Sequence, residues 1–330
     1  MEDLTDVPTE RFTVAANENA TTKSAISEEC VPPRLVTTAL ADFVALPLPH
    51  RELVVAPVLP TKGLMMIFAE RGVGKTHVSM GLGWSIACGS SFLRWKAPQP
   101  RRVLYVDGEM PQTLMQERAR ATMDTTDVRP PDKEYFRLLA LDRQPPGVSL
   151  NLAREEDQRR LEAELGDTEV IVLDNLSTLV SGGRENDAES WDTVQAWLLR
   201  LRRSGVSVIL VHHAGRSGQA RGTSKREDVL DTVVQLKRPL DYAPGQGARF
   251  EVHLTKARGV FGADAEPFEA RLTQADGRST WQCSPVRDGS AEEVESLLAE
   301  GLSVRDVADR TGLSKSQVHR IKQASEAKAA

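Results

Sequence analysis

The sequence predicts an α/β fold with a mainly parallel sheet, an antiparallel extension of that sheet and a small all-α helix-turn-helix. Apolar strand-like segments alternate with helix-like segments over the first two thirds of the chain, as in a parallel sheet covered on both faces. After residue 222, strand-like segments joined by tight turns indicate antiparallel pairing. From about residue 291, apolar residues recur at helical spacing.

Length and charge limit the organisation of the chain. Its 330 residues are enough for one large core and a small additional domain. With 42 Lys and Arg against 47 Asp and Glu, the net charge is −5, so nucleic-acid binding requires a local basic patch. We predict a disordered tail at 1–34, an α/β domain at 35–285 and a helical domain at 286–330.

No segment has the pattern of a membrane anchor or a signal peptide. No apolar run reaches the roughly 18–20 residues of a membrane helix, and the first residues lack a signal-peptide pattern. The 3 cysteines are far apart and show neither metal-binding spacing nor a disulfide framework. We therefore expect a cytoplasmic protein without a membrane partner.

Each element of the α/β domain is predicted from local hydrophobic pattern and from residues that end helices. Parallel strands are expected at 63–69, 102–109, 135–141, 169–175 and 206–213; helices at 76–88, 118–123, 154–166 and 188–205; and the strands of the antiparallel extension at 233–240, 248–258 and 268–283. The first of these strands leads into the most informative motif.

Residues 64–84 combine a strand, a glycine-rich turn and a helix. AERGVGKT (69–76) fits the phosphate-binding pattern G-x-x-x-x-G-K-[ST], except that Ala69 takes the first glycine position. The turn's N–H groups and the helix N-terminus would face phosphate oxygens, Lys75 would add a charge, and the Thr76 hydroxyl would bind Mg²⁺. The predicted cofactors are thus ATP and Mg²⁺, and a chance glycine turn is the alternative. The predicted cofactor-binding residues are Gly72, Val73, Gly74, Lys75, Thr76 and His77.

Carboxylates follow two further apolar strands. Asp174 comes directly after VIVL (170–173), the layout of a Walker B aspartate that contacts Mg²⁺, although such an aspartate can also cap a turn. Asp107 and Glu109 follow another strand, where a carboxylate could polarise the attacking water, and we favour Glu109. An ordinary solvated acidic loop is the alternative.

With these motifs, the chain resembles the RecA-fold P-loop ATPases, and more narrowly the hexameric replicative helicases of the DnaB and plasmid RepA type. Glu109 matches the family's catalytic glutamate. VHHAGR (211–216) resembles the sensor strand of the RepA-like branch, which implies that His213 detects the γ-phosphate. A plain strand end and a metal site remain alternatives for this histidine pair. The RGTS segment (221–224) matches the same branch.

The resemblance extends to TKARG (255–259), which is similar to the Lys-x-Arg motif that ring ATPases insert into a neighbouring subunit's site. It implies that Lys256 and Arg258 act catalytically in trans; an exposed Lys and Arg beside a turn are the alternative. It also implies a homo-oligomeric ring, such as a hexamer, with DNA as partner. The chain departs from the family at Ala69 and shows no recognisable N-terminal primase-interaction domain.

Residues 291–325 have the spacing of a helix-turn-helix and resemble the DNA-binding modules of resolvases. Gly312 provides the turn, and Ser314 with Gln317 forms a capping-box pattern. From Leu302 onward, the sequence contains 6 basic and 3 acidic residues, which makes this segment locally basic. A three-helix oligomerisation module is the alternative. The predicted DNA-contacting residues are Lys315, Ser316, Gln317, His319 and Arg320.

Two functions from different classes follow from these motifs. The first is Mg²⁺-dependent ATP hydrolysis coupled to DNA remodelling or unwinding, in the replication of a plasmid or mobile element. The second is an ATP-gated DNA-binding regulator or origin-binding protein without helicase activity. A recombination ATPase of the RadA type is disfavoured, because the sequence lacks the zinc-finger cysteines of that type.

Overall fold

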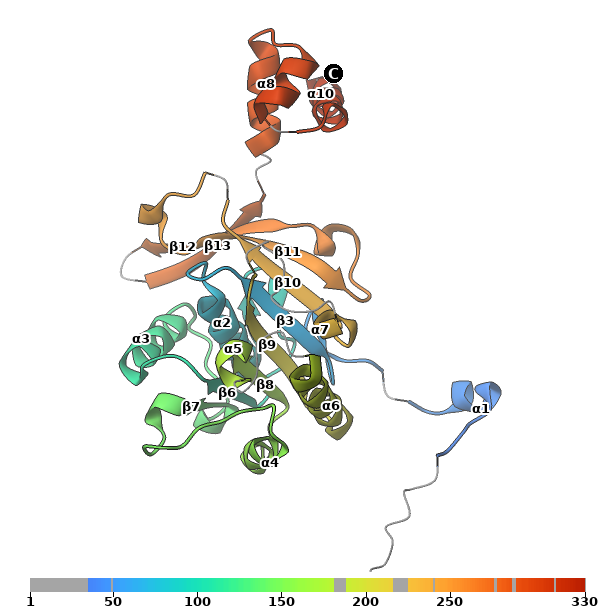
Figure 1. The fold of residues 1–330 in the computed structure, drawn as a ribbon, viewed down its shortest axis with the longest axis vertical. Coiled ribbons are helices and arrows are strands. Elements are labelled where there is room, and N and C mark those ends of the chain that lie inside the picture. Colours follow the sequence, from blue (N-terminus) through green and yellow to red (C-terminus); the bar gives the residue numbers. More distant parts are fainter. Residues whose placement is uncertain are drawn as a thin grey trace, which may run out of the picture. The chain divides into compact units, whose positions relative to one another are not determined.

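The computed structural model describes residues 35–48, 50–180, 188–215, 225–239, 241–275, 278–286, 289–311 and 313–329 (Figure 1). The chain divides into two compact units, Met1–Pro49 and His50–Ala330. The described part of the first unit contains helix α1 (Leu40–Ala45), in which no residue is buried. The predicted disordered tail lies outside the described residues.

The other helices and all strands of the described residues lie in the second unit. The strands are β1 (Leu53–Val55), β2 (Leu59–Pro60), β3 (Leu64–Ala69), β4 (Ser91–Phe92), β5 (Trp95–Lys96), β6 (Val103–Asp107), β7 (Phe136–Ala140), β8 (Val170–Asp174), β9 (Ser207–His213), β10 (Thr232–Lys237), β11 (Arg249–Ala257), β12 (Phe268–Ala275) and β13 (Arg278–Pro285). The α-helices are α2 (Lys75–Cys88), α3 (Gln112–Met123), α4 (Glu155–Ala163), α5 (Leu176–Leu179), α6 (Ala188–Ser204), α7 (Lys225–Asp228), α8 (Gly289–Ala299), α9 (Val304–Thr311) and α10 (Lys315–Ala329). Among the described helices, none is long and apolar enough to cross a membrane.

A nine-stranded sheet forms the centre of the second unit, with the order β13-β12-β11-β10-β3-β9-β8-β6-β7. The strands from β10 to β7 in this order are parallel to one another. Strands β11, β12 and β13 continue the sheet in antiparallel pairing. The predicted α/β class, with a mainly parallel sheet and an antiparallel extension, is therefore confirmed.

Strand β10 corrects one detail of that prediction. We expected residues 233–240 to belong to the antiparallel extension, but β10 pairs parallel to β3, with Val233 opposite Met66. Its other edge pairs antiparallel to β11. Residues Thr232 to Leu236 are all buried, which is typical of a strand inside a covered parallel sheet. The antiparallel part thus begins one strand later than expected.

Hydrophobic residues fill both faces of the sheet, and helices cover these faces (Figure 1). Successive side chains of a strand point to opposite faces. Accordingly, Met65 and Ile67 of β3 join the cluster that includes apolar residues of α2. Met66 and Phe68 join the other cluster, to which α4 and α6 contribute. This two-sided burial fixes the positions of the strand ends, where the candidate site lies.

Helices α8, α9 and α10 have a small core of their own. The Ser303 side chain caps α9, because its hydroxyl donates to the Asp306 carboxylate and accepts from the Asp306 N–H. The predicted turn residue Gly312 and the side chain of Gln317 lie outside the described part. The three helices therefore form as the apolar spacing predicts. Their buried residues are Val294, Leu297, Val307, Ala308 and Val318.

Candidate functional site

One cavity at the carboxyl ends of the parallel strands contains most of the predicted site residues. Its volume is about 560 Å³, within the range of small-molecule sites. The strand register brings Ala69 opposite His213, and Asp107 opposite Asp174. Segments that are far apart in sequence therefore meet at this edge. The predicted residues that line the cavity are Gly72, Val73, Gly74, Lys75, Thr76, His77, Glu109, Asp174 and His213.

The turn between β3 and α2 has a backbone conformation that suits glycine. Gly72 has a φ of 76° and Gly74 a φ of 125°, values that other residues adopt only with strain. A Cβ atom at Gly74 would also lie 3.2 Å from the Phe250 ring. Helix α2 begins directly after this turn, at the cavity wall. A glycine turn that leads into a helix N-terminus fits a phosphate group.

Lys75 is held against the beginning of the same turn. Its ammonium group donates hydrogen bonds to the carbonyl oxygens of Ala69, at 3.0 Å, and Glu70, at 2.8 Å. Burial lowers the pKa of Lys75 to about 8, while Asp174 and Glu109 favour its charged form. A pKa of about 8 leaves the side chain mainly positive at neutral pH. Ala69, at the position of the missing glycine, is buried in the core and supplies one of these carbonyls.

Asp174, at the end of β8, lies in a buried hydroxyl network and is only 4% exposed. It accepts hydrogen bonds from the hydroxyls of Tyr105, at 2.6 Å, Ser79, at 3.4 Å, and Thr76. Burial raises the pKa of Asp174, and these hydrogen bonds act in the opposite direction. Ser79 and Tyr105 are missing from the predicted site. No sequence motif relates them to Asp174, and only the packing of α2 and β6 brings their hydroxyls to its carboxylate.

Thr76 and Asp174 fit a magnesium ion bound together with a nucleotide. They place a hydroxyl and a carboxylate oxygen in direct contact, and hard oxygen ligands suit Mg²⁺. Within the described residues, no group of three or more His, Cys, Asp or Glu could hold a metal ion. Mg²⁺ commonly uses one or two protein ligands together with substrate phosphates and water. The pair is therefore consistent with such a shared site.

The two carboxylates after β6 have different surroundings. Asp107 is buried and accepts hydrogen bonds from the N–H groups of Glu109, at 3.3 Å, and Met110, at 2.7 Å. Burial raises the pKa of Asp107 to about 6. The Glu109 side chain is 57% exposed; it accepts a hydrogen bond from the Asn175 amide and lies 3.8 Å from His213 Nε2. Asp107 thus stabilises the turn, whereas Glu109 is accessible to water.

His77 and Tyr242 also line the cavity, and each contacts an arginine or lies near one. His77 lies near Arg118, and burial together with this charge lowers the pKa of His77 to about 4, so its ring is neutral at pH 7. Arg238 donates to the Gly72 carbonyl at 3.2 Å, and its guanidinium lies 4.4 Å from the ring centre of Tyr242, a residue that lines the cavity. No sequence motif marks Arg238 and Tyr242.

Lys256 and Arg258 do not line the cavity. Lys256 pairs with Val233 near the start of β10, whereas the site edge lies near Lys237. At about 3.3 Å per residue, the stretch of β10 between them spans about 13 Å. Lys256 instead donates to the carbonyl oxygens at the end of α7, as does Arg258. The predicted trans-acting residues are thus remote from the site of their own chain.

The predicted DNA-contacting residues lie on α10. Lys315, Ser316, His319 and Arg320 are exposed, and they are not among the buried residues of the three-helix core. The side chain of Gln317 is outside the described part of the chain. The exposed basic and polar residues of α10 are therefore available to contact a nucleic acid.

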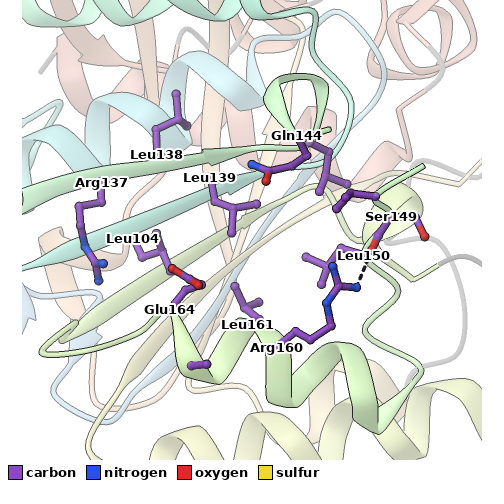
Figure 2. Close-up of a pocket in the computed structure, with 13 residues that line it drawn as sticks. Leu104, Arg137, Leu138, Leu139, Gln144, Ser149, Leu150, Arg160, Leu161 and Glu164 are labelled. Carbon is purple, nitrogen blue, oxygen red and sulfur yellow. Dashed lines mark hydrogen bonds between the residues drawn. The ribbon is translucent and has the colours of Figure 1, made fainter. Parts of the chain in front are cut away.

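A second cavity, of about 580 Å³, lies between β7, α4 and the segment that joins them (Figure 2). Its floor is mainly leucine, and none of the predicted site residues lines it. The arginines at its rim already have partners. Arg160 donates to the Ser149 carbonyl at 3.1 Å, and Arg137 donates to Leu165 O and Thr168 Oγ1. The second cavity therefore does not contain the groups predicted to bind a nucleotide.

Comparisons with solved structures find similar chains at low sequence identity. A KaiC-like protein from the archaeon Pyrococcus horikoshii is 13% identical, with a TM-score of 0.47, over 69% of this chain and 93% of the other. The flagellar accessory protein FlaH from Methanocaldococcus jannaschii is 11% identical, with a TM-score of 0.47, over 68% of this chain and 91% of the other. No curated protein sequence matches the chain.

Family models match both parts of the chain in which the sequence shows motifs. Residues 297–324 match the IclR helix-turn-helix domain, which confirms the predicted helix-turn-helix. Residues 29–219, more than half of the chain, match the AAA domain, and this stretch contains the glycine turn, both carboxylate strands and the histidine pair. The chain therefore belongs to the AAA domain family of P-loop ATPases.

Proposed function

We propose that this protein is a Mg²⁺-dependent ATPase that forms a homo-oligomeric ring, such as a hexamer, and couples hydrolysis to DNA binding and remodelling or unwinding. One observation carries the proposal. The glycine turn, Asp174 and Glu109 share one cavity, while Lys256 and Arg258 lie remote from it. Residues 35–285 would hydrolyse ATP and residues 286–330 would contact DNA. We also propose a cytoplasmic location and, from the resemblance, a role in the replication of a plasmid or mobile element.

Each residue of the cavity has a defined task in this proposal. Lys75 and the amides of the glycine turn would hold the phosphates, and Thr76 and Asp174 would hold Mg²⁺, which neutralises phosphate charge when bound. Glu109 would orient the attacking water and accept its proton. His213, beside Glu109, would contact the γ-phosphate. A charge supplied by the next subunit would then complete the site.

The remote position of Arg258 leads to a prediction about assembly. The Arg258→Ala chain should bind nucleotide normally but hydrolyse it at least about 100-fold more slowly, because each cavity would lose the charge supplied by its neighbour. The specific activity of the unmodified protein should rise with concentration as subunits associate. Steady-state hydrolysis measured across a dilution series, alongside solution mass, tests both expectations. A specific activity that stays constant from dissociated to assembled protein would exclude trans action.

The hydroxyl of Tyr105 leads to a prediction about magnesium. Tyr105→Phe removes the 2.6 Å hydrogen bond to Asp174 and so loosens the orientation of a proposed metal ligand. We expect the Mg²⁺ concentration for half-maximal hydrolysis to rise about 10-fold, as for other residues that orient metal ligands. Tyr135→Phe is the matched control, because Tyr135 stacks with Arg102 and does not line the cavity. An unchanged Mg²⁺ requirement in Tyr105→Phe would contradict the assignment of Asp174.

The exposed face of α10 leads to a prediction about DNA binding. Arg320→Ala should weaken binding to duplex DNA and reduce the slope of log K against log salt by about 1, as expected when one phosphate contact is lost. Fluorescence anisotropy at several salt concentrations measures this slope. Arg310→Ala, at an exposed arginine of α9, is the control. Equal slopes for Arg320→Ala and the unmodified protein would remove α10 from the interface.

The helix-turn-helix favours a second candidate function, an ATP-gated DNA-binding regulator or origin-binding protein without helicase activity. A recognition helix reads base edges in the major groove, and a processive motor has little need for such sequence recognition. A strand-displacement assay with ATP and Mg²⁺, together with footprinting on genomic fragments, separates the two functions. Strand displacement supports the motor. A defined footprint without displacement supports the regulator, and the motor would then be wrong.

A further inference from the structure

Helix α7 holds the proposed trans-acting side chains. Lys256 Nζ donates to the carbonyl oxygen of Glu227 and, at 3.2 Å, to that of Asp228; Arg258 Nη2 donates to the Asp228 carbonyl at 3.1 Å. The backbone N–H of Arg258 also donates to the carbonyl oxygen of Asp231 at 2.9 Å. The positions of both side chains therefore depend on α7 and on the residues directly after it.

The same helix contacts the strand that ends in the candidate site. Arg226 of α7 is 9% exposed, and its Nη1 lies 2.9 Å from Nε2 of His212, which is 2% exposed. The guanidinium also lies 5.4 Å from the ring centre of Trp191. Because arginine stays protonated and only donates, Nε2 of His212 must accept, and the imidazole is neutral with its proton on Nδ1. A buried, charge-assisted hydrogen bond thus joins α7 to β9.

His212 and His213 are consecutive residues of β9, so their side chains point to opposite faces of the sheet. On one face, His213 lies 3.8 Å from Glu109 in the cavity. On the other face, His212 contacts Arg226. A displacement of the end of β9 that moves His213 also moves His212. Close packing then transmits this displacement to α7.

We propose that Arg226 and His212 are positioning residues that couple the β9 strand of one subunit to the Lys256 and Arg258 side chains that this subunit presents to its neighbour. This inference rests on the proposed trans action of those side chains. In such a ring, the coupling would run from the β9 strand of one subunit to the site of its neighbour. The position of the end of β9 at His213 in one subunit sets the position of the Lys256 and Arg258 side chains in the next subunit's site. Hydrolysis at neighbouring sites thereby becomes coupled.

A mixture of two defective chains isolates this coupling. A Glu109→Gln chain cannot activate water in its own cavity but keeps Lys256 and Arg258 for its neighbour. An Arg258→Ala chain keeps its own cavity but presents no complete cation pair. In an equimolar mixture, we expect hydrolysis only in Arg258→Ala cavities that adjoin a Glu109→Gln chain. A mixture that stays inactive while the unmodified protein is active would overturn the trans action, and the coupling with it.

The informative change is His212→Leu placed in the Glu109→Gln chain, whose own cavity is already inactive. We expect the rate of the mixture to fall about 10-fold, within the usual range of coupling between sites. His212→Gln in the same chain keeps an oxygen that accepts from Arg226, and it should restore most of the rate. Arg226→Lys in the same chain is a second variant. It keeps the charge but loses the planar guanidinium, so it should also lower the rate of the mixture.

The chain in which His212→Leu is placed distinguishes coupling between subunits from an effect within one cavity. The thermal unfolding midpoint and ATP binding of the His212→Leu donor chain should match those of its Glu109→Gln parent, which shows that the donor is folded. An active mixture whose rate does not respond to His212→Leu in the donor would overturn the coupling alone. A loss that occurs only when His212→Leu is placed in the Arg258→Ala chain would also overturn it, because the pair would then act within its own cavity.

Discussion

Lys75→Ala should lower ATP hydrolysis by at least about 100-fold, as expected when a preorganised positive group at a phosphate is removed. The substitution has two physical consequences. It removes a positive charge that would face the β- and γ-phosphates, and it removes hydrogen bonds to the carbonyls of Ala69 and Glu70. Steady-state phosphate release and equilibrium nucleotide binding measure the two losses. Both rate and affinity should fall.

Lys75→Arg is the matched variant for this prediction. Arginine keeps the charge, but its planar fork does not reproduce the point charge of an ammonium group, so we expect little recovery of activity. Circular dichroism and thermal unfolding without nucleotide should show both variants folded. Hydrolysis by folded Lys75→Ala protein within a few-fold of the unmodified rate would contradict the proposed phosphate site.

Glu109→Gln should separate binding from chemistry. The amide keeps the size of the side chain but cannot accept the proton of the attacking water, so we expect hydrolysis to fall by about 100- to 10,000-fold. Nucleotide affinity should stay close to that of the unmodified protein, because Glu109 is placed to meet water rather than to bind phosphate. Single-turnover hydrolysis and equilibrium binding, measured on the same preparation, test this separation.

Asp107→Asn is the control that decides between the two carboxylates. Asp107 accepts hydrogen bonds from the N–H groups of Glu109 and Met110, and an asparagine oxygen can still accept them. The Asp107→Asn variant should therefore lose much less activity than the Glu109→Gln variant. The reverse order would identify Asp107 as the base. That outcome would require the exposed Glu109 side chain to have another task.

Local sequence patterns predict the parts of the fold that depend on periodicity and glycine chemistry. The strand before the glycine turn, the helix that begins at Lys75 and the strand that ends at Asp174 all form at the expected places. Strand β10 shows the limit of such patterns. An apolar run identifies a buried strand, but whether it pairs in parallel depends on which neighbour it meets, here β3.

Residues that act through contacts across the sheet escape a linear search. Tyr105 and Ser79 reach Asp174 only because β6, β8 and α2 pack together, and neither is a defined position of the phosphate-binding pattern. The same holds for Asn175 beside Glu109 and for Arg226 beside His212. The sequence therefore indicates the residues that would meet the phosphates, whereas the residues that position them emerge from the three-dimensional structure.

Binding of Mg²⁺–ATP, measured by isothermal titration calorimetry on folded protein, tests the central claim most directly. The cavity formed by the glycine turn, Lys75 and Asp174 predicts one nucleotide per chain, with affinity strongly reduced by Lys75→Ala. Absence of detectable binding to the folded, unmodified chain would contradict the assignment of this cavity. The proposals for hydrolysis, trans action and coupling would then lose their basis.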